Sequence, residues 1–216
     1  MSLVKLIDAA DERGLAASGL ACLERCLPLP VQEAGSDVFR PLWAGIGGGG
    51  QEWAGRLAAT RLALDEAVAA RTATGAAPDP TAPDVTAVLV GTLLASAPEQ
   101  WAARQLRTWA DTCSVVALEI HQKLDAVGDT SGDAAAAERL ARCREDAAAV
   151  PDAVEGAEGG DGVGPLVAGE LRRQISILEI LAETEGPAGL RRAMELSTEG
   201  QRVLRAVVSR RARARS

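Results

Sequence analysis

The sequence predicts an all-α fold, a single-domain bundle of about seven to nine helices that includes one long helix and one buried apolar helix. Apolar residues recur at helical spacings of three and four along most of the 216-residue chain, and no stretch shows the sustained alternation of a strand. Hydrophobic residues make up 47% of the chain and charged residues 25%, which is typical of a globular protein with a core and not of a disordered chain. The length fits one domain spanning residues 1–216.

Four helices are expected in the first third of the chain. The segments with helical spacing of apolar residues are 3–10, 15–27, 38–43 and 51–72. Ser2 and Ser36 precede the first and third segments as N-caps, because their hydroxyls can accept from a free backbone N–H. Pro28 and Pro30 end the second segment, since proline cannot continue a helix. The tetrad GGGG at 47–50 completes a G-x-G-x-x-G pattern, but no strand precedes it, so we expect a connector instead of a phosphate-binding loop.

The sequence predicts that the most buried helix and the longest helix both lie in the middle of the chain. Residues 85–97, VTAVLVGTLLASA, follow Asp84 as an N-cap and are apolar on nearly every side, which is typical of a central helix. Residues 96–99, SAPE, have the Ser-x-x-Glu spacing of a capping box. We expect this box to open a helix of roughly thirty residues that ends at Gly128 and packs along its length against a partner helix.

The last third predicts three helices and one loop. Asp133 is expected to cap an alanine-rich helix. Residues 151–165 are acidic and rich in glycine, which predicts a mobile loop, because few apolar groups are present to offset the entropy of ordering it. Two further helices are expected at 166–185 and 188–211, separated by a Gly-Pro break.

The net charge of −7 is unevenly distributed along the chain. A basic C-terminal end at 202–216 holds six arginines and no acid, so the remaining residues carry a net charge of −13. The arginines are Arg202, Arg205, Arg210, Arg211, Arg213 and Arg215. They are the candidate residues for contact with an acidic protein or an anionic membrane surface, while a purely solubilising role is the simpler interpretation of such a run. Nucleic acid is less favoured, because no aromatic residues are interleaved for base stacking.

The four cysteines are expected to carry reduced thiols. The chain is large enough not to need disulfides, and its first residues do not have the pattern of a signal peptide. Cys22 and Cys26 lie one helical turn apart, but structural zinc needs four ligands, so we expect core packing there and neither a metal nor a cofactor. The longest apolar run is shorter than the roughly 20 residues that cross a bilayer. We therefore expect a cytoplasmic protein without a transmembrane segment.

His121 is the one imidazole available for acid–base chemistry. Asp125 lies one turn after it and Cys113 two turns before it, yet such pairs arise on any polar helix, so we expect a surface or half-buried histidine and no catalytic site. The four tryptophans are expected first of all as core anchors. Alternatively, Trp101 and Trp109 line a ligand pocket near His121.

Four glutamates lie in or beside the segment 166–185. They are Glu170, Glu179, Glu183 and Glu185. None of them belongs to a Glu-x-x-His pattern, which a di-iron site in a helical bundle needs. We expect them on a solvated helix face.

Three segments in the N-terminal part of the chain are distinctive together: residues 22–30 (CLERCLPLP), 39–45 (FRPLWAG) and 53–57 (WAGRL). They resemble small helical proteins of Streptomyces and related actinobacteria. Within that group the chain is similar to a protein encoded beside glucose kinase and linked to carbon catabolite repression. The scarcity of lysine beside abundant arginine and glycine agrees with a high-GC genome. The resemblance implies a regulatory role and carries over no catalytic residue.

The sequence therefore favours a non-enzymatic regulatory or adaptor protein that acts by binding another protein. No catalytic constellation is recognisable in it, and its charges are separated into an acidic body and a basic end. Two alternatives stay open. One is an enzyme or small-ligand-binding protein that uses the Trp-lined pocket near His121, and the other is a nucleic-acid or membrane-surface binder that uses the C-terminal arginines.

Overall fold

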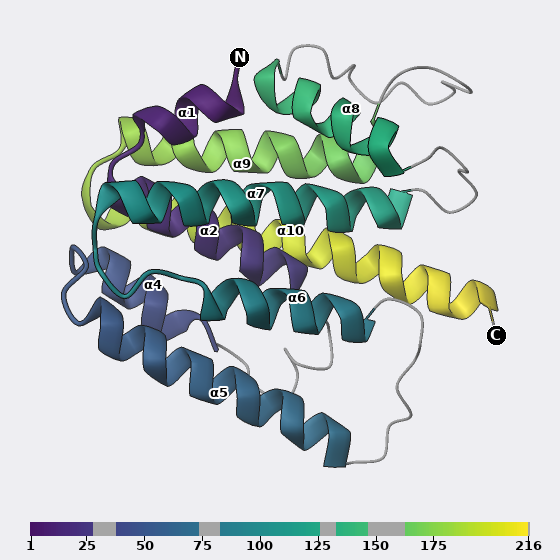
Figure 1. Ribbon diagram of the computed structural model, residues 1–216, viewed down its shortest axis with the longest axis horizontal. Coiled ribbons are helices and arrows are strands. Elements are labelled where there is room, and N and C mark those ends of the chain that lie inside the picture. Colours follow the sequence, from purple (N-terminus) through teal and green to yellow (C-terminus); the bar gives the residue numbers. More distant parts are fainter. Residues whose placement is uncertain (28–37, 74–82, 126–132, 147–162, 216) are drawn as a thin grey trace.

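The computed structural model describes residues 1–27, 38–73, 83–125, 133–146 and 163–215. In these ranges the chain forms nine α-helices and no strand, which confirms the predicted all-α class. The helices are α1 (Leu3–Ala9), α2 (Glu12–Cys26), α4 (Arg40–Gly47), α5 (Trp53–Ala73), α6 (Pro83–Ala95), α7 (Ala103–Asp125), α8 (Asp133–Glu145), α9 (Pro165–Glu183) and α10 (Gly186–Arg215). They pack around one apolar core to which each of them contributes (Figure 1).

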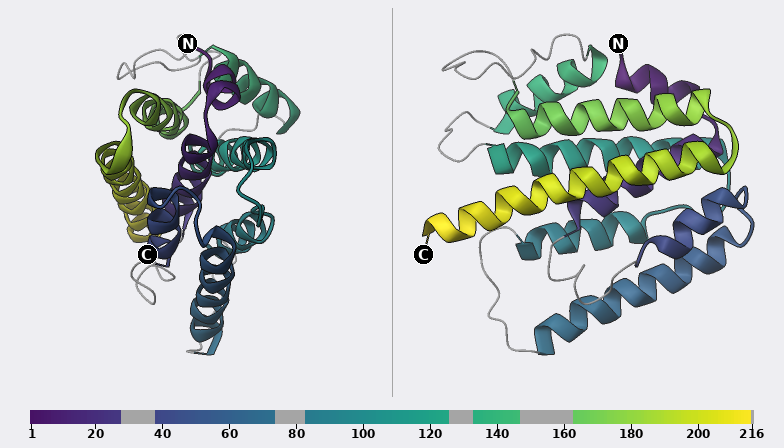
Figure 2. Two further views of the ribbon diagram at one scale, coloured as in Figure 1. Left: turned by 90° about the vertical axis from the view of Figure 1, so that its left-hand side faces the viewer. Right: turned by 180° about the vertical axis from the view of Figure 1, so that it is seen from behind.

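Helix α2 lies at the centre of the bundle, with α7, α9 and α10 packed around it (Figure 2). Twelve of its fifteen residues are buried, and many of them are alanine or glycine. Such small residues let neighbouring helices approach closely. At Gly19, for example, an added Cβ would lie only 2.6 Å from the ring of Trp109. The Asp11 side chain caps α2 by accepting from the backbone N–H of Gly14 at 2.7 Å.

The apolar segment that the sequence places at the centre, α6, lies at the periphery. Val90 and Leu94 on its inner face are buried, but Val88 on the opposite face is 67% exposed. Apolar character alone does not make a helix central. Helix α2 takes that place because its small side chains allow three helices to surround it. Helix α6 begins at Pro83, so Asp84 lies inside the first turn, and its prediction as the N-cap is wrong.

The predicted capping box at the start of α7 does not form. The hydroxyl of Ser96 donates to the carbonyl of Leu93 at 2.9 Å and so belongs to the end of α6, while α7 begins only at Ala103. The free carbonyls between residues 94 and 97 are bound by the guanidinium of Arg61 from α5. A cation from another helix thus satisfies this helix end. Helix α7 has 23 residues, and α10, with 30, is the longest helix in the described ranges.

Several other helix ends are held by polar side chains. Ser2 caps α1 as the sequence predicts. Asp125, the last residue of α7, accepts from two backbone N–H groups in the first turn of α9 at 3.0 Å. Arg13 of α2 donates to the carbonyl of Gly186 at 2.6 Å, where α9 gives way to α10. These bonds join segments that are far apart in the sequence.

Two predicted features fall largely outside the described residues. One is the cap at Ser36, and the other is the loop at 151–165, of which residues 163–165 alone are described and Pro165 belongs to α9. The glycine tetrad connects α4 to α5, as predicted. Gly49 and Gly50 there have φ angles of 70° and 80°, a backbone region that glycine adopts without steric cost.

Candidate functional site

A cluster of polar side chains lies inside the core, where α2, α7 and α9 meet. Its centre is an ion pair between Arg25 of α2 and Glu170 of α9, whose side chains are both 0% exposed. Arg25 donates through Nε to Oε2 of Glu170 at 2.8 Å and through Nη2 to Oε1 at 2.6 Å. Two parallel charge-assisted bonds are a strong way for arginine to hold a carboxylate.

Side chains of α7 and α9 complete this buried polar cluster. Gln174 donates through Nε2 to Oε1 of Glu170 at 2.9 Å and accepts from the hydroxyl of Ser114 at 2.6 Å. His121 pairs through Nδ1 with the carbonyl of Ala117 at 2.7 Å, and Nδ1 is the donor because a carbonyl can only accept. Its Nε2 lies 3.6 Å from Oε2 of Glu170, which is an ion-pair distance when the imidazole is protonated. The cluster therefore joins three helices through polar bonds.

The electrostatics of the cluster keep its carboxylate ionised. Burial by itself raises the pKa of a carboxyl group. At Glu170 the charges of Arg25 and His121, together with the hydrogen bonds that the carboxylate accepts, outweigh burial and lower the pKa to about 2. The negative charge needed to hold Arg25 in the core is thus present at neutral pH.

Two sequence predictions are wrong at this cluster. Glu170 is predicted on a solvated face but is fully buried, and His121 is predicted at the surface or half-buried but is 2% exposed. The signal that could have located Glu170 is its spacing, because it shares the buried stripe of α9 with Val167 and Leu171 on either side of it. A polar residue in such a stripe is buried and needs a buried partner.

The thiols near the cluster are poor candidates for nucleophiles. Burial raises the pKa of Cys22 to about 12 and raises the pKa values of Cys26 and Cys113 well above their usual value. These thiols stay protonated at neutral pH, and the thiolate is the form that attacks. Asp125 binds the start of α9 with both carboxylate oxygens. The residues around His121 therefore do not form a nucleophile–base pair.

Three of the four tryptophans, Trp53, Trp101 and Trp109, lie together at the other end of α7. The ring centroid of Trp53 lies 5.2 Å from that of Trp101 and 6.4 Å from that of Trp109, with both pairs edge to face. The indole of Trp109 donates to the carbonyl of Leu93 at 2.9 Å. His121 follows twelve residues after Trp109, which is about 18 Å along a helix. The structure brings Trp101 and Trp109 together with Trp53, and not with His121.

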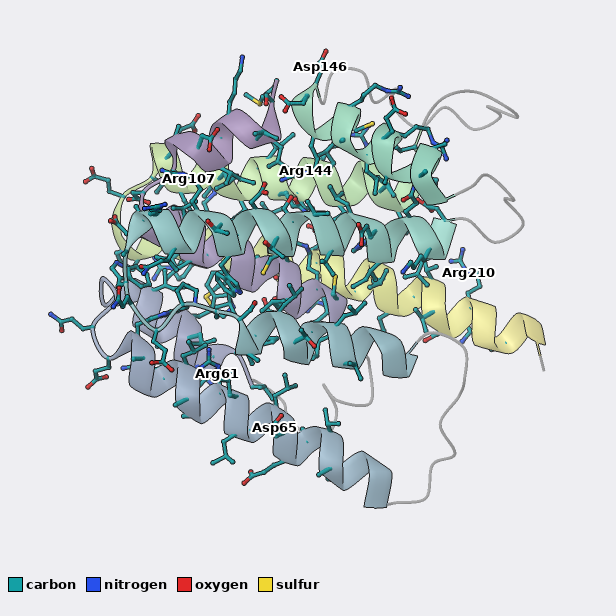
Figure 3. The ribbon with its side chains drawn as sticks, in the orientation of Figure 1. Arg61, Asp65, Arg107, Arg144, Asp146 and Arg210 are labelled. Carbon is teal, nitrogen blue, oxygen red and sulfur yellow. The ribbon has the colours of Figure 1, made fainter. Side chains whose placement is uncertain are left out.

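A cavity of about 570 Å³ lies beside α8, next to the start of α1. Its charged lining residues are of both signs, and several of them pair with acids or with the chain's own amino group. Arg144 bonds to Asp111, and Asp146 bonds to the N-terminal amino group at 3.3 Å (Figure 3). Because the lining holds three arginines and three acids, the cavity favours no single charge of ligand. Neither His121 nor Trp101 nor Trp109 lines it.

The C-terminal part of α10 is an exposed basic element. Helix α10 is anchored through a buried stripe of residues spaced three or four apart: Leu190, Ala193, Ser197, Gly200 and Leu204. Beyond this stripe the helix projects past the ends of α7 and α9 (Figures 1 and 2). Arg202, Arg205, Arg210 and Arg213 are exposed, while the side chains of Arg211 and Arg215 lie outside the described residues. Val203 is 38% exposed, and Val207 is half-buried. We call residues 202–215 the projecting end, which includes Leu204, the last residue of the buried stripe.

No family model matches this chain, and neither a curated protein nor a solved structure is significantly similar to it. Among the side chains that the structure describes, no group of three or more His, Cys, Asp and Glu residues is placed to hold a metal ion. None of the described helices has the length and apolar character needed to cross a bilayer.

Proposed function

We propose that this protein is a non-enzymatic regulatory or adaptor protein that binds an acidic partner protein through the projecting end of α10. The observation that carries this proposal is the exposure of arginines and of Val203 on a helix that extends beyond the bundle (Figure 1). A helix with an apolar ridge and flanking charges is a common ligand for a groove on a partner protein. Arginine is also enriched among the residues that dominate binding energy at interfaces.

The packing of the preceding turns presents this end in one orientation. The hydroxyl of Ser197 donates to Oε2 of Glu24 at 2.6 Å, and Nε2 of Gln201 donates to the backbone carbonyl of Glu24 at 3.1 Å. Both bonds hold α10 against α2 immediately before the projecting end begins. A helix whose direction is already fixed loses less conformational freedom on binding.

The charge distribution favours a protein partner over nucleic acid. Residues outside the basic end carry a net charge of −13, which repels a phosphate backbone brought close to the body of the molecule. Helix α10 contains no aromatic residue, so the projecting end lacks the side chains on which unpaired bases stack. A partner protein with a local acidic groove can bind the projecting end even though the body of this chain is acidic and α10 has no aromatic residue.

Support for a specific process comes from the resemblance of the N-terminal segments and not from the geometry. That resemblance makes carbon catabolite regulation the setting in which we propose that the adaptor acts. The proposal does not depend on it, because the projecting end would bind a partner in the same way in any process.

The experiment is the capture of partners from a high-GC actinobacterial lysate at low and moderate salt. It compares the full chain with the double variant Arg202→Glu, Arg210→Glu. A matched control, Arg191→Glu, Arg192→Glu, makes the same change of charge at two exposed arginines in the part of α10 that precedes the projecting end. We expect the full chain and the control to retain a defined protein that the projecting-end variant loses, and retention should weaken with salt.

Two outcomes would contradict the proposal. Retention of the same protein by all three chains would place the binding surface elsewhere. Loss of the retained material after nuclease treatment would show that the arginines bind nucleic acid and not a protein.

A further inference from the structure

The outer face of α5 is a second exposed surface with both apolar and charged residues. We define it by Ala58, Leu62, Asp65, Glu66 and Ala69, all of which are exposed and lie on one side of the helix because they are spaced three or four apart or in multiples of these. Leu62 is 61% exposed, one of five large apolar side chains exposed among the described residues. The opposite side of α5, with Trp53, Leu57 and Leu64, faces the core.

The charge of this face is purely acidic. The neighbouring Arg56 pairs with Glu52 at 2.8 Å. Arg61 is turned towards the end of α6, where it binds backbone carbonyls. Neither cation therefore neutralises Asp65 or Glu66 on the outer face. The face presents one large apolar residue with two carboxylates beside it.

The projecting end of α10 has the complementary pattern. Val203 and Val207 lie on one side of the helix, and Arg210 follows Val207 by three positions, just as Asp65 and Glu66 follow Leu62 by three and four. Three to four residues span about 5 Å of helix axis. Two such helices lying side by side in the same direction would place Leu62 against Val207 and the two carboxylates beside Arg210.

These two surfaces do not meet within one molecule. Asp65 lies on α5 at one edge of the bundle, whereas Arg210 lies on the end of α10, well away from it (Figure 3). The complementary charges can therefore pair only between copies. Because each copy has both surfaces, two copies can exchange the contact reciprocally, as a two-fold symmetric dimer requires.

From this complementarity we infer that the chain forms a reciprocal dimer, in which the projecting end of each copy docks on the outer face of α5 of the other. The dimer covers the same arginines that the proposed function assigns to an acidic partner. Self-association then competes with partner binding, and this regulatory consequence rests on the proposed function, whereas the dimer does not.

The test is sedimentation equilibrium of the full chain from micromolar to millimolar concentration, at low and moderate salt. It includes the variant Asp65→Lys, Glu66→Lys and the variant Arg202→Glu, Arg210→Glu. A third variant, Glu183→Lys, Glu185→Lys, is the control, since it makes the same change of charge at two exposed residues, the last residue of α9 and a residue between α9 and α10. We expect each of the first two variants to weaken dimerisation at least tenfold, roughly the effect of opposing like charges at an interface, and the control to leave it unchanged.

The decisive sample is an equimolar mixture of the two interface variants. Each variant alone opposes like charges, but a mixed dimer pairs lysines with glutamates at one contact and the original acids with the original arginines at the other. We expect association to be restored in the mixture alone. A full chain that stays monomeric throughout, or a mixture that associates no better than its components, would overturn the inference.

This result is separable from the proposed function. The variant Asp65→Lys, Glu66→Lys leaves the projecting end intact, so it should still capture the acidic partner, and with higher apparent affinity if the dimer competes. Failure of the dimer with intact capture removes only the inference about self-association. Failure of capture with an intact dimer removes only the proposed function.

Discussion

The two halves of α10 belong to one helix but are held in different ways. In residues 186–201 the helix is seated on α2, where Ser197 and Gln201 bond to Glu24 and Gly200 allows close contact. In the projecting end the exposed residues are mostly arginine, and the buried stripe stops at Leu204. The comparison shows that one continuous helix can contain an anchor whose stability depends on the core and an extension that depends on the anchor.

The surface against which residues 186–201 of α10 pack includes part of the buried polar cluster. A Cβ added at Gly200 would lie 2.5 Å from Cδ of Arg25 and 2.8 Å from Cδ of Arg173. Arg25 cannot move aside easily, because its guanidinium is bonded to Glu170 in the core. The ion pair therefore defines the surface on which α10 rests. Changes to the cluster should disturb the anchored half, and changes to the projecting end should not.

The largest expected effect is that of Glu170→Ala. Removal of the carboxylate leaves Arg25 charged and buried without a counter-ion, and breaking a buried pair in this way costs about 3–5 kcal/mol of unfolding free energy. Urea unfolding followed by circular dichroism measures this loss. Glu183→Ala, an exposed position on the same helix, is the control and should change stability by less than about 0.5 kcal/mol. Equal stability of the two variants would mean that the ion pair does not support the fold.

The next effect is the dependence of stability on pH. Because the pKa of Glu170 is lower in the folded chain than its ordinary value of 4.5, the unfolded state takes up the proton first as pH falls. The contribution of Glu170 is therefore complete above that value and is lost as pH falls from about 4.5 towards 2. We expect Glu170→Gln to be less stable at neutral pH and to lose less stability in this acid window. Parallel pH profiles for the two chains would contradict this account.

A smaller effect is expected when the same substitution is made at two helical glycines. Gly200→Ala forces a Cβ against Arg25 and Arg173, and overpacking of this kind costs about 1–2 kcal/mol. At Gly55, in the first turn of α5, an added Cβ has nothing within 4 Å. Gly55→Ala should therefore stabilise by up to about 1 kcal/mol through helix propensity. Thermal unfolding of both variants checks the opposite signs, and a stabilising Gly200→Ala would show that α10 is not seated closely there.

The smallest effect on stability is expected in the projecting end. Arg202→Glu with Arg210→Glu changes exposed side chains away from the core, so the unfolding free energy should change by less than about 0.5 kcal/mol. Binding in the capture and sedimentation experiments should nevertheless be lost. A large loss of stability in this variant would mean that the projecting end is packed against the body and would remove the contrast between the two halves.

Much of the fold could be predicted from local pattern. The spacing of apolar residues located the helices, and Ser2 was recognisable as a cap because an N-cap bond joins residues only three apart. The box at residues 96–99 failed because Ser96 belongs to the end of α6, where its hydroxyl donates to Leu93 and where Arg61, more than thirty residues away in the sequence, binds the carbonyls. The same distinction holds for the candidate site. The arginines of the projecting end could be predicted because they form a run of charge in the sequence. The partners of Glu170 could not, because they come from three helices.

By itself, the sequence determined that the chain is helical and that its last residues are basic, because helical periodicity and charge are properties of neighbouring residues. Only the tertiary structure decided that α2 and not α6 is central, and that Glu170 and His121 are buried. Burial depends on which helix faces meet, and that depends on how closely small residues such as Gly19 and Gly200 let the helices approach. The tertiary structure also decided that most of the basic stretch lies beyond Leu204, where the buried stripe of α10 ends.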